Sequence, residues 1–169
     1  MGRVVNKDRC TLRDVCYSDL PTLYSFESDP AWYTMAKVKP RSEADFELAW
    51  KRIFRDWADD KIGVVQKTVL LDGEVCGTIG CRLIENRWEI GYGFAKSYWG
   101  QGIATCAVNL FLDGLVERPL YAKVAVTNIA SIRVLTKNKF VLVKTQTSEE
   151  TDRFLDREES VFIREHTGK

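Results

Sequence analysis

Three closely spaced strand segments constrain the fold of this chain more than any other feature of its sequence. Each is rich in β-branched and aromatic residues, and together they cover residues 63–71, 75–84 and 88–94. The turn-forming pairs Asp72-Gly73 and Glu85-Asn86 separate them. Because such short turns join antiparallel neighbours, the sequence predicts a three-stranded antiparallel meander. Gly77 and Gly80 predict a bulge or a close backbone contact within the second strand.

Helices and further strands surround this meander. Before it, we expect a strand over 10–15, a helix over 20–27 that ends at Asp29-Pro30, and a longer helix over 42–60. After it, strands and helices alternate, with helices expected over 102–116 and 129–137 and strands over 120–126, 140–145 and 159–164. This order predicts the mixed α/β class, with a central mixed sheet of six to seven strands and helices on both faces. A length of 169 residues fits a single domain over residues 1–169.

Charge and hydropathy narrow the function classes. The chain has 25 Lys and Arg against 24 Asp and Glu, a net charge of +1, which argues against a nucleic-acid partner. Apolar runs all fall well short of the ~20 residues that a membrane helix needs. The first residues contain no apolar stretch of the signal-peptide kind. We therefore expect a cytoplasmic protein without a membrane partner.

Cysteine and histidine usage argues against a metal site. The five cysteines form no CxxC pair, and the one histidine, His166, lies close to the end of the sequence. A zinc site or a Ser-His-Asp triad therefore lacks a convincing set of residues. Cys106, which follows the glycine-rich turn described next, is expected to be a small buried apolar residue and not a nucleophile.

A glycine-rich turn between a strand and a helix is the segment most suggestive of chemistry. It reads YWGQGIAT over residues 98–105. Glycines let the backbone approach a phosphate closely, and the first amides of a helix lack partners within the helix. The turn is thus either a phosphate cradle or an ordinary strand-to-helix connection. It matches neither the Walker pattern nor the dinucleotide GxGxxG pattern.

Two motifs in this half of the chain resemble those of one family. The segment 99–104, WGQGIA, and the segment 128–140, NIASIRVLTKNKF, resemble motifs of the GNAT acetyltransferase superfamily, and within it of the RimJ/RimL-like protein N-acetyltransferases. Segments 11–13 and 72–80 also resemble that branch, so the resemblance covers roughly residues 8–165. Two residues depart from the patterns: Trp99 stands where the wider superfamily has Arg or Gln, and Lys139 stands where the branch has glycine.

The resemblance implies acetyl-CoA as cosubstrate and no metal. The residues implied to bind it are the turn residues Gln101, Gly102, Ile103, Ala104 and Thr105, the strand end Gly93, Phe94 and Ala95, and the helix residues Asn128 and Ser131. Asn128 is expected to bond the pantetheine amide, to cap its helix, or both. Many members carry a tyrosine on this helix that acts as the acid, and its position is occupied by Leu135 here. Ser131 is therefore the candidate for assisting departure of the sulfur. A helical serine satisfied by its own backbone is the alternative.

Glu89 is the candidate base. It is a carboxylate on an otherwise apolar and aromatic strand, and by resemblance it occupies the position that some GNAT enzymes use as a base. The alternative is a solvated charge on the exposed face of the strand. Trp32 and Tyr33 lie between the two predicted N-terminal helices, in a region that the family uses as a substrate wall; exposed aromatic anchors of a loop are the alternative.

These observations predict an N-acetyltransferase that moves an acetyl group from acetyl-CoA to a primary amine by direct attack. The favoured acceptor is the N-terminal α-amine of a protein or peptide, and a small amine such as a polyamine or an antibiotic is the alternative. A non-catalytic CoA-binding domain is the rival from another class, supported by Leu135. An enzyme acting on charged tRNA would need a basic face, which the net charge does not suggest. The protein is expected to be a monomer or a homodimer.

Overall fold

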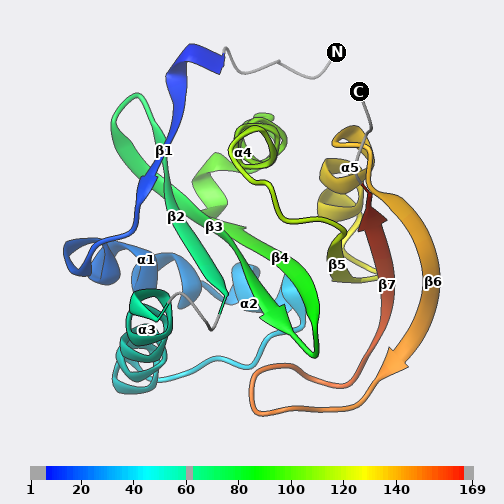
Figure 1. Cartoon of the computed structure of the whole chain (residues 1–169). Coiled ribbons are helices and arrows are strands. Elements are labelled where there is room, and N and C mark those ends of the chain that lie inside the picture. The colour runs from blue at the N-terminus through cyan, green and yellow to red at the C-terminus, as the bar shows by residue number, and fades with distance from the viewer. Residues whose placement is uncertain (1–6, 60–62, 166–169) are drawn as a thin grey trace.

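The computed structural model describes residues 7–59 and 63–165, and His166 lies outside them. Seven strands and five α-helices make up the described chain (Figure 1). The α-helices are α1 (Leu20–Glu27), α2 (Pro30–Ala36), α3 (Glu43–Ala58), α4 (Ile103–Asp113) and α5 (Ile129–Lys137). The strands are β1 (Cys10–Asp14), β2 (Val64–Leu71), β3 (Glu74–Ile84), β4 (Arg87–Phe94), β5 (Leu120–Ala125), β6 (Val141–Ser148) and β7 (Arg157–Arg164). Short 3-10 helices cover Lys7–Arg9, Tyr17–Asp19 and Lys96–Tyr98.

All seven strands form one sheet in the order β1-β2-β3-β4-β5-β7-β6. The predicted meander is present as β2, β3 and β4, which pair antiparallel. The pair β4 and β5 runs parallel, whereas the other neighbouring pairs run antiparallel. The sheet is therefore mixed, as the sequence predicts.

The parallel pair is also the weakest joint of the sheet. Its register contains two partners, Trp88 with Leu120 and Glu89 with Tyr121. Beyond them β4 continues to Phe94 along β3, while β5 continues along β7, so the two strands diverge (Figure 1). We call the opening between residues 90–94 and 122–125 the fork. Along the fork, β4 and β5 are neighbours in the sheet order, but the described residues show no strand pairing between them there.

Helices cover both faces of the sheet. One apolar core joins the sheet to α4 and α5, and it includes Cys76, Phe111 and Leu135. A second core joins the other face to α1 and α3, through residues such as Leu23 and Trp50, and Val75 packs against it. Neighbouring residues 75 and 76 thus serve opposite cores, as the two-residue period of a strand requires.

The N-terminal helices differ from the prediction at one place. The pair Asp29-Pro30 follows the end of α1, as predicted, but it also begins α2, a helix that the sequence pattern does not predict. The Asp29 carboxylate accepts a hydrogen bond of 2.8 Å from the Ala31 amide, and Pro30 fills the first turn, where no amide donor is needed. Ser42 caps α3, because its Oγ accepts from the Asp45 amide at 3.1 Å.

Gly77 and Gly80 allow the close backbone contacts that the sequence predicts. A Cβ at Gly77 would lie 2.3 Å from the Gly93 carbonyl oxygen, and one at Gly80 would lie 2.5 Å from the Val65 carbonyl oxygen. Gly91, in contrast, has open space on its side-chain face.

Lys139 takes the conformation that glycine usually supplies at a helix exit. Its φ is +62°, in the left-handed region, and the Phe140 amide bonds back to the Leu135 carbonyl at 3.0 Å. The departure from the family pattern therefore leaves the helix exit intact.

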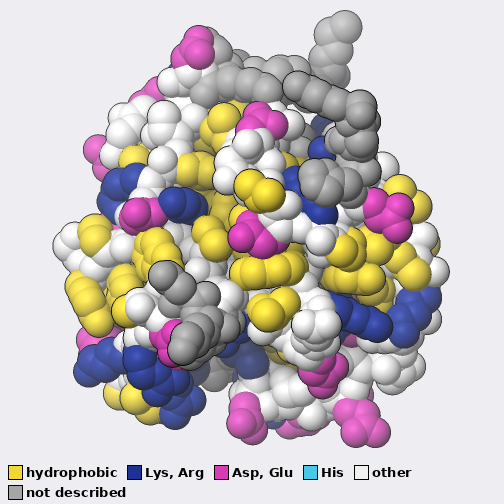
Figure 2. Space-filling view, viewed as in Figure 1, with side chains coloured by type: hydrophobic (Ala, Val, Ile, Leu, Met, Phe, Trp, Pro, Cys, Tyr) yellow, Lys and Arg dark blue, Asp and Glu magenta, His cyan; other side chains and the backbone are white. Residues whose placement is uncertain are grey.

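The surface shows charges of both signs. Acidic and basic side chains are interspersed over the face in Figure 2, with apolar patches between them. None of the helices in the described part of the chain is long and apolar enough to span a membrane.

Candidate active site

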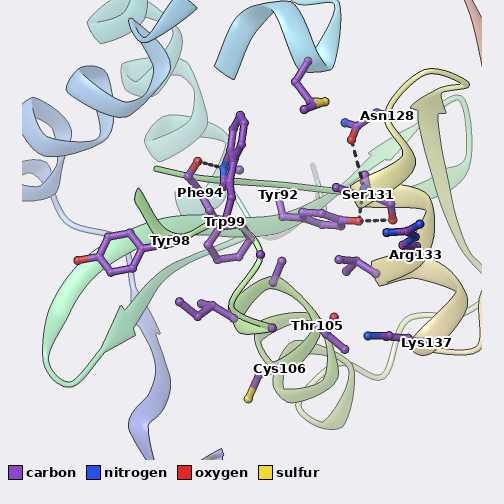
Figure 3. Close-up of a pocket in the computed structure, with 18 of the residues that line it drawn as sticks. Tyr92, Phe94, Tyr98, Trp99, Thr105, Cys106, Asn128, Ser131, Arg133 and Lys137 are labelled. Carbon is purple, nitrogen blue, oxygen red and sulfur yellow. Dashed lines mark hydrogen bonds between the residues drawn. The ribbon is translucent and has the colours of Figure 1, made fainter. Parts of the chain in front are cut away.

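A cavity of about 800 Å³ opens at the fork, between the end of β4 and the N-termini of α4 and α5. Its lining comes from α2, β4, the turn before α4, α4 itself and α5. Figure 3 shows these elements converging on it. A volume of this size suits a large cofactor-like ligand.

The N-terminus of α4 lies at the cavity without a side-chain cap. Gly102 occupies the N-cap position with φ +81°, and no side-chain hydrogen bond caps this end. Side chains cap α2, α3 and α5, through Asp29, Ser42 and Asn128, whereas α1, which starts away from the cavity, also has no side-chain cap. The first amides of α4 are thus left to a ligand, and the helix dipole makes an anion the favoured one.

Charges on the cavity wall point to the same kind of ligand. Arg133 and Lys137 line it, one helical turn apart on α5, and Figure 3 shows Lys137 across from Thr105. Within the described residues the lining contains no carboxylate. The buried amide of Asn138 donates to the Thr105 carbonyl at 3.2 Å, which fixes α5 against the first turn of α4. Two cations and an uncapped helix start therefore share one wall.

At the end of β4, some backbone groups have partners within the protein and others face the fork. The Ala95 amide donates to the Cys76 carbonyl at 3.1 Å, and Trp99 Nε1 donates to the Phe94 carbonyl at 2.9 Å. Since backbone groups alternate along a strand, the amides of Tyr92 and Phe94 face away from β3 and into the fork. Ala95 lines a second, smaller cavity on the other side of the strand end.

Three side chains meet where α5 begins. Asn128 Oδ1 accepts from the Ser131 amide at 3.2 Å, so Asn128 does cap the helix. The hydroxyls of Tyr92 and Ser131 lie 2.8 Å apart, and the Tyr92 oxygen is also 3.3 Å from the Ser131 carbonyl oxygen. Burial raises the pKa of Tyr92 to about 12, and its hydrogen bond with Ser131 acts in the opposite direction. Tyr92 is therefore a neutral phenol at physiological pH.

Glu89 lies at the apex of the fork. Its carboxylate forms an ion pair of 2.7 Å with Lys123 of β5, and its side chain is 17% exposed. It shares a strand face with Gly91 and Gly93, whereas Tyr92 and Phe94 point to the opposite face. Glu89 is outside the lining of the large cavity and reaches the fork from its other side.

The side of the cavity opposite α4 and α5 is formed by α2. Trp32, Met35 and Ala36 line it, and we call these residues the α2 wall. A Cβ at Gly93 would lie 2.8 Å from Trp32 Cζ2, so this glycine admits the indole against β4. Tyr33, in contrast, is half-buried outside the cavity.

The loop 149–156, between β6 and β7, fastens the α2 wall in place. The Lys39 amide bonds the Arg153 carbonyl at 2.8 Å, and the Leu155 amide bonds the Lys37 carbonyl at 3.0 Å. The Arg153 guanidinium donates to the nearly buried Glu27 carboxylate at 2.7 Å and lies 5.9 Å from the centre of the Trp32 ring. Arg41 binds the same carboxylate at 2.6 Å.

The structure brings most of the sequence-predicted residues together. The large cavity is lined by Trp32, Gly93, Phe94, Gly102, Ile103, Ala104, Thr105, Asn128 and Ser131. It is not lined by Tyr33, Glu89, Ala95 or Gln101, and the exposed Gln101 bends back to donate to the Ser97 carbonyl at 2.8 Å. Cys106 lines the cavity and is buried on α4, as expected of a small apolar residue.

Sequence reasoning missed several contributors to the site. Arg133, Lys137 and Asn138 stand inside the quoted segment 128–140, and Tyr92 stands in the predicted strand 88–94 with Glu89, so their closeness to the candidate residues was a usable signal. Arg153 gave no such signal, because its partner Glu27 is 126 positions away in the sequence. No group of His, Cys, Asp and Glu suited to a metal ion occurs within residues 7–59 and 63–165.

Comparisons with known proteins agree with this geometry. A model of the acetyltransferase (GNAT) domain matches residues 9–141. A curated relative, described as the uncharacterized N-acetyltransferase p20 of Bacillus licheniformis, is 27% identical over 144 residues, 79% of each chain. Among solved structures, a RimL ribosomal L7/L12 α-N-protein acetyltransferase in complex with coenzyme A superposes with a TM-score of 0.77 at 19% identity, covering 93% of this chain and 94% of that one. Mycobacterium smegmatis RimJ gives 0.73 at 22% identity, covering 92% and 81%.

Because the family model spans most of its length, the chain belongs to the GNAT acetyltransferase family. It is an acetyl-CoA-dependent acetyltransferase of this type, and the mixed sheet is the fold that the resemblance implied. The predicted family, fold class and enzyme class are thereby confirmed.

Proposed function

We propose that this protein transfers the acetyl group of acetyl-CoA to the N-terminal α-amine of a protein or peptide. The observation that carries the proposal is the wall made by α4 and α5, where an uncapped helix start and two cations meet without a carboxylate among the described lining residues. The acceptor assignment is supported by the structural similarity to RimL, a ribosomal L7/L12 α-N-protein acetyltransferase.

The phosphates of acetyl-CoA would bind at the start of α4. The amides of Ile103, Ala104 and Thr105 supply donors, and Gly102 lets the backbone come close to them. Arg133 and Lys137 add positive charge from α5. Gln101 contributes at most its backbone, because its side chain is bonded to Ser97.

The pantetheine arm would enter the fork and replace the missing ladder between β4 and β5. The arm can pair with the backbone amides of Tyr92 and Phe94, which face the fork at the exposed edge of an interrupted sheet. Asn128 uses its amide oxygen for the helix cap, so its NH₂ group remains suited to donate to the arm. Ala95 is less suited, because its amide is already paired with Cys76.

The acceptor would approach from the side of the α2 wall. An amine is a cation at neutral pH and must lose a proton before it attacks the thioester carbonyl. Glu89 lies on the strand face that points to this side, and the open space at Gly91 separates it from Gly93. We assign Glu89 the role of base or amine-positioning group, with the Lys123 ion pair holding its carboxylate at the apex of the fork.

A panel of amines with acetyl-CoA tests the acceptor. Peptides with free N-termini, polyamines and aminoglycosides are compared by release of CoA, and the site of acetylation is read by mass spectrometry. The matched control is each peptide with its N-terminus blocked and an internal lysine retained. Acetylation confined to unblocked N-termini supports the proposal. Acetylation of the small amines alone would show that a small amine, and not a protein N-terminus, is the acceptor. Tight CoA binding without turnover of any amine would indicate a non-catalytic CoA-binding domain.

A further inference from the structure

Tyr92 is the side chain that spans the fork. It starts on β4, shares its strand face with Phe94, whose ring centre is 6.3 Å away, and ends at the first turn of α5. Figure 3 shows its hydroxyl between the backbone and the side chain of Ser131. The two distances are 2.8 Å to Ser131 Oγ and 3.3 Å to the Ser131 carbonyl oxygen.

This geometry allows two arrangements of the hydroxyl hydrogens. In the first, Ser131 donates to the Tyr92 oxygen and Tyr92 donates to the Ser131 carbonyl. In the second, Tyr92 donates to Ser131 Oγ, and the Ser131 hydrogen is released towards the cavity. Negative charge in the cavity favours the second arrangement, because a hydroxyl donor then faces the anion. The pair can thus respond to charge that develops during a reaction.

We propose that Tyr92 is a positioning residue that holds the Ser131 hydroxyl with its hydrogen directed at the departing sulfur of acetyl-CoA. The inference rests on the proposed function and adds to it the residue that controls the leaving-group contact. An interaction that strengthens as the thiolate forms accelerates the chemical step, whereas one already present in the ground state does not.

Tyr92 orients and does not itself protonate the sulfur. Its pKa of about 12, raised by burial, lies far above the value of about 8.5 that a free thiol of the cysteine kind shows. Transfer of its proton to the thiolate would therefore be unfavourable by several powers of ten. Leu135, which is buried, cannot supply a proton from the next turn of α5 either.

The bonds balance without a proton from the phenol. The neutral amine nitrogen forms a bond to the acetyl carbon, and the carbon–sulfur bond breaks with its electron pair on sulfur. The thiolate accepts the Ser131 hydrogen bond and then takes one proton from solvent, while the newly acylated nitrogen releases its extra proton to solvent. Tyr92 and Ser131 finish the cycle in their starting protonation states.

The competing explanation is a structural one. Tyr92 joins β4 to α5, so its hydroxyl would then simply hold the fork at a fixed width. The two roles differ in whether the effect of removing the Tyr92 hydroxyl depends on the presence of Ser131 Oγ. An orienting role vanishes when Ser131 loses its hydroxyl, whereas a bracing role through the Ser131 carbonyl survives.

The test measures the thiol of bound CoA, so that it does not depend on the acceptor. The thiolate absorbance of the CoA complex is titrated against pH, with the desulfo-CoA complex subtracted to remove protein tyrosines. Wild type, Tyr92→Phe, Ser131→Ala and the double variant are compared, and Tyr121→Phe, on β5 outside the cavity lining, is the matched control. Thermal melts establish that each variant folds.

We expect each single variant to raise the pKa of the bound thiol by about 0.5 to 1, the size of one hydrogen bond. The double variant should match Ser131→Ala alone, and Tyr121→Phe should match wild type. A Tyr92→Phe effect that persists in full after Ser131→Ala would overturn the orienting role and establish the brace. An unchanged pKa of the bound thiol in a folded Tyr92→Phe complex would also overturn the orienting role. Failure of wild type to bind CoA would instead refute the proposed function.

Discussion

The two sides of the cavity are built in different ways. The α4–α5 side offers a backbone anion site, with a positive φ at Gly102 and unpaired first-turn amides, to which Arg133 and Lys137 add positive charge. The α2 wall is apolar, and charged side chains behind it hold it in place, with Glu27 bound by Arg41 and Arg153 from distant parts of the chain. Binding at a backbone site is therefore expected to be lost when a side chain is added there. Binding at a wall held by ion pairs is expected to weaken when a charged side chain is removed.

Gly102→Asp should break the α4–α5 side and have the largest effect. The substitution places a carboxylate at an anion site and a Cβ at a φ of +81°. We expect acetyl-CoA affinity to fall on the order of 10³-fold, because charge-assisted hydrogen bonds are lost and a like charge is added. Isothermal titration calorimetry measures the affinity of the folded variant.

Gly73→Asp is the matched control for that experiment. Its φ is +86°, so the backbone strain is the same, but it lies in the β2–β3 turn with open space around it. Affinity equal to wild type is expected. If Gly102→Asp also bound acetyl-CoA normally, the phosphates would have to bind elsewhere.

Glu89→Gln tests the apex, where the two sides meet. The change keeps the shape and removes the charge and the basicity, so we expect a loss on the order of 10²-fold in kcat/KM. The loss should shrink as pH rises, because more of the amine then arrives neutral. Initial rates over a pH series, with an acceptor from the panel, measure both effects.

The same substitution at Glu85, in the exposed turn of the same hairpin, is the control and should leave the pH profile unchanged. Wild-type rates and an unaltered profile in Glu89→Gln would place the base elsewhere. They would also limit the 2.7 Å ion pair between Glu89 and Lys123 to a structural role.

Arg153→Met should loosen the α2 wall alone. The variant leaves Glu27 with Arg41 as its partner and removes the guanidinium next to Trp32. We expect the acceptor KM to rise about 5- to 10-fold through the lost hydrogen bonds and the cation–π contact. The acetyl-CoA KM should stay within about twofold, because the other wall is untouched.

Arg133→Met is the reciprocal variant. It removes a cation from the α4–α5 side, so the acetyl-CoA KM should rise while the acceptor KM stays constant. Steady-state kinetics with both substrates varied separates the two constants. Equal responses of both constants to both variants would show that the walls act as one unit, contrary to the comparison.

The same contrast explains how much the sequence could predict. The meander and the α4 turn follow from local rules, so Asp72-Gly73 and the 98–105 segment predicted them well. The role of Trp32 depends on Gly93 and Arg153, which meet it through tertiary packing. Helix α2 was missed because Asp29-Pro30 reads equally well as the end of one helix and the start of the next. Long-range partners of charged residues leave no local pattern.

The acidity of Asp19 offers the smallest and most localised prediction. This buried carboxylate precedes α1, the helix that leads to the α2 wall, and it accepts from Arg13 at 2.7 Å and from Thr68 at 2.8 Å. The Arg13 guanidinium holds the pKa of Asp19 well below its usual range. A depressed folded-state pKa adds stability above the unfolded value of about 3.9, and that stability is lost as pH falls towards the folded value.

Asp19→Asn should therefore lower the free energy of unfolding by about 1–2 kcal/mol at pH 7, since Arg13 is partly exposed and solvent screens the pair. Urea unfolding at a series of pH values should show the gap between wild type and variant closing below pH ~4. Acetyl-CoA affinity should not change, because Asp19 lies outside the cavity lining. A gap that stays constant down to the acid transition would mean that packing, and not the charge of Asp19, fixes the start of α1.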